Sequence, residues 1–434
     1  MRLFKRQGGQ IATGDGHSIL GFALVVAVIL AMAQLLFIPA SVSASSISQS
    51  QASSSFATSK PVPRTLVSPN AQPLGEFGTS VAASGSLVAV GAPLETVDGM
   101  SDAGRAYVFN AGTGALVVTL VSPNPEPGGD FAASIALSGN IVVVGAPLET
   151  ADGISGAGRA YVFSALTGAL METLTSPNAQ PTGAFGYAVA IDGGTAVVSA
   201  LSESVAGFQG AGRAYTFDAS TGALLNTMVS PNAQSAGGFG ASVGISNGVI
   251  VVGAWSEAVN GVKIAGRAYT FNAETGALVH TFISPHVQAV GEFGFSVAIS
   301  GSTVVVGAWS EDIGRVKTTG RVYTFDETTG GLLRTIKSPN PQSGGQFGFS
   351  VAVSGTTLMI GARYETVTGA RGAGHAYVFN PTTGALIVTV SSPNAHSYGE
   401  FGFAVAVSGS VGVVGAPLET ASGQGSAGNA YVYT

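Results

Sequence analysis

The sequence has no cysteine and very little charge. None of its 434 residues is Cys, and only 9% are Asp, Glu, Lys or Arg. Without cysteine, the fold cannot rely on disulfides, so it must be held by packing. Low charge, 63 glycines and 46% hydrophobic residues predict a large all-β body with tight turns and exclude a disordered chain.

Basic residues are the scarcer kind of charge. The chain holds 17 Lys and Arg against 23 Asp and Glu. When the four charged residues before the first apolar run (Arg2, Lys5, Arg6 and Asp15) are left out, 14 basic and 22 acidic residues remain, a net charge of −8. Such a chain does not attract a polyanion, so nucleic acid is not an expected partner.

Recognisable catalytic motifs are absent as well. There is no serine elbow, no glycine-rich phosphate loop before a helix and no cysteine nucleophile. The four histidines after the N-terminal segment fall at different positions of the repeat described below: His280, His286, His375 and His396. The symmetry of the repeat therefore does not bring the histidines together around the axis of the ring. We predict neither a metal site nor an enzyme.

The N-terminal 44 residues have the pattern of an export signal. Three basic residues precede an apolar run from Ile19 to Ile38, and Val42 and Ala44 form an A-x-A-like cleavage site. Residues 1–44 are predicted to be a signal peptide or, because the run is long enough to span a bilayer, an uncleaved membrane anchor. In both cases the remainder lies outside the cytoplasm, secreted or anchored to the surface, and residues 45–61 form a serine-rich tether.

What the chain has in abundance is repetition. The segment that begins at Ser68 returns at a constant spacing, without insertion or deletion, at Ser122, Ser176, Ser230, Ser284, Ser338 and Ser392. The length of one copy is near that of a four-stranded propeller blade. In the first copy the predicted strands are Phe77–Ser84, Leu87–Ala92, Arg105–Asn110 and Leu116–Val121. Small residues in the first strand indicate the innermost position, and the variable polarity of the fourth indicates the wetted outer edge.

The last copy ends at Thr434, after its third strand. The missing strand has a counterpart at the other end, because Thr65 and Leu66 stand in the register of Thr119 and Leu120. Residues Val62–Val67 are therefore predicted to complete the last blade and to close the ring. The predicted fold is one all-β domain over residues 62–434, a seven-bladed β-propeller with four-stranded blades.

The segment "FGTSVAASGSLVAVGAP", which begins at Phe77, resembles the FG-GAP repeat. This repeat forms the propeller of integrin α subunits and of many microbial surface proteins. Each copy repeats the phenylalanine: Phe77, Phe131, Phe185, Phe239, Phe293, Phe347 and Phe401. "GAP" itself recurs at Gly91, Gly145 and Gly415. The resemblance implies recognition of an extracellular ligand and no reaction.

Two cofactors occur in proteins with similar repeats, and the sequence favours neither. Calcium-binding FG-GAP repeats carry an Asp-rich loop between the Phe-Gly and Gly-Ala-Pro strands, but here that interval is a bare turn whose only acidic residue is Asp192. One carboxylate does not supply six oxygen ligands, so no calcium is expected. "AYTFDASTGALLNT" from Ala214 resembles quinoprotein (PQQ-type) propeller repeats, but the tryptophan usual near the end of the fourth strand is missing.

One acidic residue recurs in every copy, at the start of the loop between the second and third strands: Glu95, Glu149, Glu203, Glu257, Glu311, Glu365 and Glu419. Ten residues later stand Arg105, Arg159, Arg213, Arg267, Arg321, His375 and Asn429. The glutamates could form an acidic ring for cations or basic partners. A role repeated in every blade favours the alternative, a structural Glu–Arg pair that holds the loop.

A candidate binding patch lies in blades four to six. There the "GAPLET" of blades one, two and seven is replaced, and aromatic and basic residues occur together: Trp255, Trp309, Arg363, Tyr364, Lys263, Arg315, Lys317 and Arg371. Such residues are common anchors of binding sites, although each Trp could also serve only to cap its blade. The sequence thus predicts a surface protein that binds a protein or glycan; the alternatives are a structural component of the cell envelope and a quinoprotein-like oxidoreductase.

Overall fold

The computed structural model of the chain describes residues 61–434. The signal peptide or anchor expected over residues 1–44 lies outside them, as does the expected tether except for Pro61. Every regular element within the described residues is a β-strand. No helix in this part of the chain is long and apolar enough to cross a membrane.

Twenty-eight strands make up the described region. The first is β1 (Arg64–Val67). Blades one to three contain β2 (Ser80–Ser84), β3 (Leu87–Ala92), β4 (Arg105–Asn110), β5 (Leu116–Val121), β6 (Ser134–Ser138), β7 (Ile141–Ala146), β8 (Arg159–Ser164), β9 (Leu170–Leu174), β10 (Phe185–Asp192), β11 (Thr195–Ala200), β12 (Arg213–Asp218) and β13 (Leu224–Val229). Blades four to seven contain β14 (Phe239–Ser246), β15 (Val249–Ala254), β16 (Arg267–Asn272), β17 (Leu278–Phe282), β18 (Ser296–Ser300), β19 (Thr303–Ala308), β20 (Arg321–Asp326), β21 (Leu332–Lys337), β22 (Phe347–Ser354), β23 (Thr357–Ala362), β24 (His375–Phe379), β25 (Leu386–Ser391), β26 (Val405–Ser408), β27 (Val411–Ala416) and β28 (Asn429–Tyr433).

The strands form seven antiparallel sheets of four, which are the predicted blades. In six of them the four strands follow one another in sequence. The seventh has the order β1-β28-β27-β26, so the N-terminal strand completes it. Thr65 pairs with Tyr431, as Thr119 pairs with Tyr107 in blade one. The predicted closure is confirmed, with a closing strand that begins at Arg64 rather than at Val62.

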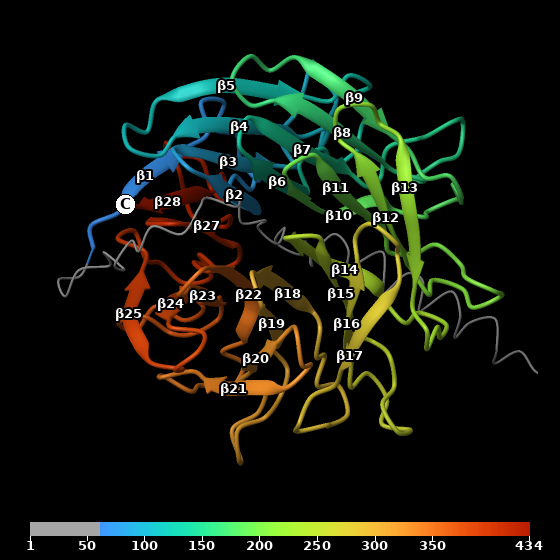
Figure 1. Cartoon of the computed structure of the whole chain (residues 1–434). Coiled ribbons are helices and arrows are strands. Elements are labelled where there is room, and N and C mark those ends of the chain that lie inside the picture. The colour runs from blue at the N-terminus through green and yellow to red at the C-terminus, as the bar shows by residue number, and fades with distance from the viewer. Residues whose placement is uncertain (1–60) are drawn as a thin grey trace, which may run out of the picture. The chain divides into compact units, whose positions relative to one another are not determined.

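The innermost strands of successive blades contact one another around a ring, and β26 contacts β2 where the ring closes (Figure 1). Small residues permit this approach. The Ser80 hydroxyl donates to the carbonyl oxygen of Ala132 in the next blade at 2.7 Å. A Cβ on Gly91 would lie 2.3 Å from the same oxygen, so only glycine fits there. In blade one the inner strand begins at Ser80, later than the predicted Phe77, whereas β10, β14 and β22 begin at their phenylalanine.

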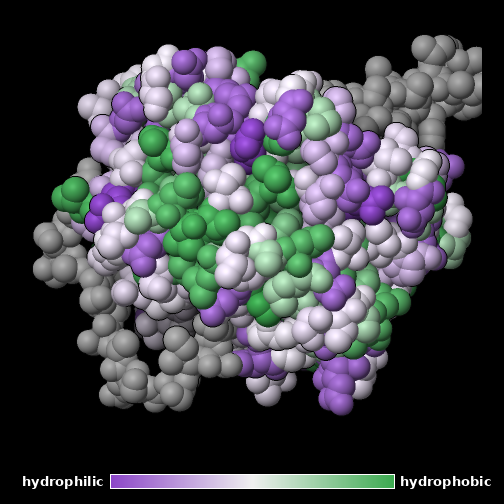
Figure 2. Space-filling model, turned by 90° about the horizontal axis from the view of Figure 1, so that it is seen from above, coloured by the Kyte–Doolittle hydropathy of each residue, from purple (hydrophilic) through white to green (hydrophobic). Residues whose placement is uncertain are grey.

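Each blade has a buried aromatic core. In blade one the rings of Phe77 and Tyr107 lie 5.8 Å apart, and Phe77 meets Phe109 edge-on at 6.0 Å. The middle strands β3 and β4 are buried on both faces by the adjacent blades. The outer strands instead expose two consecutive apolar residues in most blades, such as Leu116 and Val117. Figure 2, seen from above Figure 1, shows hydrophobic side chains gathered on this rim.

Loops that carry the candidate site emerge together on one face. Because neighbouring strands are antiparallel, the loop between the second and third strands and the linker between blades leave at the same end. In blade one these are residues 93–104 and 68–79. The Gly128 N–H of the following linker donates to the Ser101 carbonyl at 2.9 Å. We call this surface, made of the seven loops and seven linkers, the loop face.

Candidate functional site

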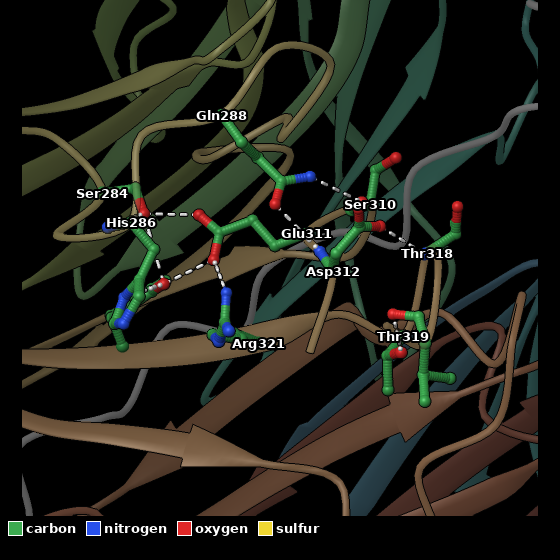
Figure 3. Close-up of polar contacts among 11 residues, drawn as sticks. Ser284, His286, Gln288, Ser310, Glu311, Asp312, Thr318, Thr319 and Arg321 are labelled. Atoms are coloured by element: carbon green, nitrogen blue, oxygen red, sulfur yellow. Dashed lines mark hydrogen bonds and ion pairs between the residues drawn. The ribbon is translucent and has the colours of Figure 1, made fainter. Parts of the chain in front are cut away.

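The repeated glutamates lie inside the blades, each at the centre of a hydrogen-bond network. In blade five the Glu311 carboxylate accepts a hydrogen bond from the Ser284 hydroxyl (Figure 3). The Tyr323 hydroxyl donates a second hydrogen bond to the same carboxylate. Arg321 Nη1 lies 3.0 Å from Glu311 Oε2 and forms an ion pair with it. Ser284 begins the linker that enters the blade, and Tyr323 and Arg321 lie on β20. The network therefore fastens linker, loop and third strand together.

The tyrosine is the most regular partner of this glutamate, and the sequence analysis did not identify it. A tyrosine hydroxyl donates to the glutamate in all seven blades, from Tyr107, Tyr161, Tyr215, Tyr269, Tyr323, Tyr377 and Tyr431. The signal was present in the sequence, because a tyrosine follows the Arg position by two residues in every copy. Its bond to the glutamate was found only in the structure.

The expected basic partner varies more from blade to blade. Arg105, Arg213 and Arg267 place Nε 3.3–3.5 Å from their glutamates. In blade six His375 Nδ1 takes this place at 3.0 Å, and in blade seven Asn429 donates to Glu419 at 2.9 Å. Those five pairs lie within single blades. In blade two Arg159 instead donates its Nε–H to the Thr150 carbonyl at 3.0 Å.

The glutamate side chains are not available to a ligand. All seven are fully buried. Burial raises the pKa of Glu149 to about 7, only partly offset by the hydroxyls of Ser122 and Tyr161. Burial also raises the pKa of Glu311, with the bonds from Ser284, Tyr323 and Arg321 opposing it. A carboxylate in this position stabilises the loop, and it offers no surface to a cation.

Both tryptophans of the predicted patch are half-buried in an aromatic cluster that crosses blades four to seven. The Phe295 ring lies 6.3 Å from Trp255 and 5.6 Å from Trp309. The cluster continues through Phe349, 5.1 Å from Phe295, to Phe403, 5.3 Å farther on. These phenylalanines stand two residues after the Phe-Gly phenylalanine of their blades. They occur in the same part of the ring as the two tryptophans that replace the proline of Gly-Ala-Pro. The sequence analysis did not recognise that these large aromatic residues pack together.

Arg363 requires a correction. It was expected at the surface of the patch, but it is buried, 4% exposed. Its guanidinium lies 3.7 Å above the Phe349 ring and 4.5 Å from Tyr364, and it pairs with Glu400 at 3.1 Å. The aromatic rings and the carboxylate compensate the buried charge, so Arg363 holds the cluster together. Tyr364 is partly buried beside it.

The exposed part of the patch is basic. Lys263, Arg315, Lys317 and Arg371 are exposed on the loops of blades four to six. Lys317 forms an ion pair with Asp312 at 2.7 Å, and its side chain is 73% exposed. In this sector the basic residues are thus exposed, and the two tryptophans and Tyr364 are half-buried.

A second set of carboxyl groups precedes the Phe-Gly pairs, and the sequence analysis missed it. Glu76, Asp130, Glu292 and Glu400 each stand directly before the phenylalanine of their blade. Burial, with Glu400 and Asp102 nearby, raises the pKa of Glu76 to about 7. Burial alone raises the pKa of Glu292 to about 8, partly offset by Trp309. Comparing this one position across the seven copies would have revealed the set.

Metal-binding geometry is not found among residues 61–434: no three His, Asp or Glu side chains there are grouped to hold an ion. The turns that replace the calcium loops bond to the next blade instead. The Gly139 N–H donates to Ser84 Oγ at 2.9 Å, and the Asn247 N–H donates to Asp192 Oδ2 at 2.8 Å.

Comparison with known families agrees with this geometry. Six segments match the FG-GAP repeat: residues 64–109, 116–163, 170–217, 282–325, 335–379 and 388–433. Together they cover more than half of the chain. The chain belongs to the FG-GAP repeat family. Between residues 218 and 281, where no segment matches, the structure shows the strands of an FG-GAP blade, β14–β16. No curated protein matches the sequence.

Proposed function

We propose that this FG-GAP protein is an exported, non-enzymatic recognition protein that binds an extracellular protein or glycan through its loop face. The proposal rests on a difference between the buried residues of the blades, which are repeated, and the residues of the loops, which vary. The buried glutamate, tyrosine and phenylalanine are the same in all blades, whereas the charged residues of the loops differ from blade to blade. A rigid scaffold with variable loops on one face is the usual arrangement of a binding domain.

Blades four to six are the proposed contact region. Lys263 and Lys317 are exposed there, and Trp255, Trp309 and Tyr364 are half-buried in the same sector. Exposed cations and half-buried aromatic residues in one sector suit a partner with acidic and apolar groups. The proposal includes export directed by residues 1–44, with the propeller secreted or anchored at the cell surface, and it involves neither calcium nor a quinone.

The test measures binding of the full chain to a glycan array and to purified extracellular proteins. We expect Lys263→Glu with Lys317→Glu to weaken binding at least tenfold, about 1.4 kcal/mol, with unchanged stability. Arg334→Glu, at an exposed arginine inside β21 on the rim, is the matched control. Equal binding by the loop and rim variants would contradict the proposed site.

The tryptophans need a separate comparison because they also pack. Trp255→Ala and Trp309→Ala are expected to lower both the melting temperature and the affinity. If stability falls while binding stays intact, the two residues serve packing alone and the contact region lies elsewhere.

A further inference from the structure

The charges of the loop face are divided between two opposite sectors. In blades one and two the exposed loop charges are acidic, on Asp98, Asp102 and Asp152. In blades four to six they are mainly basic: Lys263, Lys317 and Arg371, which share one position of the repeat, and Arg315. Asp312, which pairs with Lys317, is partly exposed in the same sector. The first three copies have Ser101, Ser155 and Gln209 at that shared position. One face of the propeller thus carries an acidic sector and a basic sector.

The two sectors lie diametrically opposite each other. The acidic sector is centred midway between blades one and two, and the basic sector is centred on blade five. Around a closed ring of seven, these centres are half a turn apart. The loops of blades three and seven separate the sectors, and their only charged residues, Glu203 and Glu419, are fully buried.

Exposed aromatic residues mark both neutral boundaries. Phe208 is in the loop of blade three and is 44% exposed. Tyr398 is in the linker that enters blade seven and is 52% exposed. Apolar groups of this size are favourable to bury in a contact. The face therefore has one exposed aromatic residue at each boundary between the sectors of opposite charge.

This pattern is complementary to itself. A two-fold axis parallel to the face and running over blades three and seven turns a second copy so that its acidic sector covers the basic sector of the first. The same rotation places the basic sector of the second copy over the acidic sector of the first, and the aromatic residues near the axis. Two-fold contacts of this isologous kind are the commonest way in which identical chains associate.

We propose that two copies of this protein associate face to face through their loop faces. A partner with charge of one sign that covered the whole face would meet repulsion on half of it, whereas a second copy meets attraction on both halves. The charges are exposed, so the association depends on ionic strength. It uses the face of the proposed function, and a bound partner and a second copy would therefore exclude each other.

The experiment is sedimentation of the full chain in non-ionic detergent, at about 0.01 M and about 1 M salt, where the screening lengths are ~30 Å and ~3 Å. We expect a dimer at the lower ionic strength and a monomer at the higher one. The basic-reversed variant (Lys263→Glu, Lys317→Glu, Arg371→Glu) should associate at least tenfold more weakly. The acidic-reversed variant (Asp98→Lys, Asp152→Lys) should do the same.

A mixture of the two reversed variants decides the question. The loop face of the basic-reversed variant is then mainly acidic, and that of the acidic-reversed variant is mainly basic. An equimolar mixture should therefore form a heterodimer. Misfolded variants would not regain association on mixing, so this result excludes a folding defect. A rim reversal, Arg334→Glu, should leave the dimer unchanged. A monomer at low salt, a mixture that stays monomeric, or equal loss in the rim variant would overturn the proposal. No partner is present in this assay, so its result is independent of the proposed function.

Discussion

Substituting the buried glutamate should have very different effects in two blades, although the residue occupies the same position in both. Glu311 in blade five faces Arg321, whose side chain is only 8% exposed. Glu311→Gln keeps an oxygen to accept from Tyr323 but removes the charge that compensates the guanidinium. Leaving one buried charge without its partner costs about 3–5 kcal/mol. We expect the free energy of unfolding to fall by that amount.

Glu149 in blade two lacks the direct ion pair, because Arg159 bonds to the Thr150 carbonyl. Its raised pKa, about 7, means that the neutral form is substantially populated near neutral pH. Glutamine resembles that neutral form, so Glu149→Gln should perturb one hydrogen bond and cost only about 1 kcal/mol. The difference between the two variants, a few kcal/mol, is the quantity of interest.

Urea unfolding followed by the fluorescence of Trp255 and Trp309 measures both values from midpoint and slope. Glu274→Gln, at an exposed turn, is the matched control and should change stability by no more than about 0.5 kcal/mol. Equal losses at Glu311 and Glu149 would show that the arginine does not determine the cost. No loss at either position would refute a structural role for the glutamates.

Three further outcomes are expected. Deletion of Val62–Val67 should leave β28 as an unpaired edge and promote aggregation, measured by light scattering; a deletion variant that stays monomeric and melts like the parent would show that β1 does not close the ring. Because burial raises the pKa of Glu292 from its ordinary 4.5 to about 8, the stabilising contribution of its neutral form is fully present below about pH 4.5 and is lost as the pH rises through about 8. The urea midpoint should therefore fall between about pH 4.5 and about pH 8. The fall should be smaller in Glu292→Gln, because glutamine does not titrate and already stands at the corresponding position of blade six, as Gln346. Identical pH profiles for the two proteins would argue against this assignment. Protease added to intact cells should digest the propeller or its tether, and recovery of the chain from the cytosol with residues 1–44 attached would contradict export.

The sequence alone determined the architecture, because the information that specifies strands and turns is local and is repeated seven times. The constant spacing of the copies predicted blades of equal size, and Thr65 in the register of Thr119 predicted the closing strand. The middle strands of blade one have the predicted bounds, Leu87–Ala92 and Arg105–Asn110. The start of the inner strand of blade one was placed too early, at Phe77 instead of Ser80.

Only the tertiary structure decided which side chains meet and which face the solvent. Arg363 is buried because Phe349 of its own blade and Phe403 of the next surround its guanidinium together with Glu400. Likewise, Glu76 is near Glu400 only because blade one adjoins blade seven, although the two residues belong to the first and last copies of the repeat. Periodicity specifies each blade, whereas contacts across the ring depend on its closure. The sequence pattern therefore predicts the scaffold, and the arrangement of charge and aromatic groups on the loop face follows from the way seven blades fit around one axis.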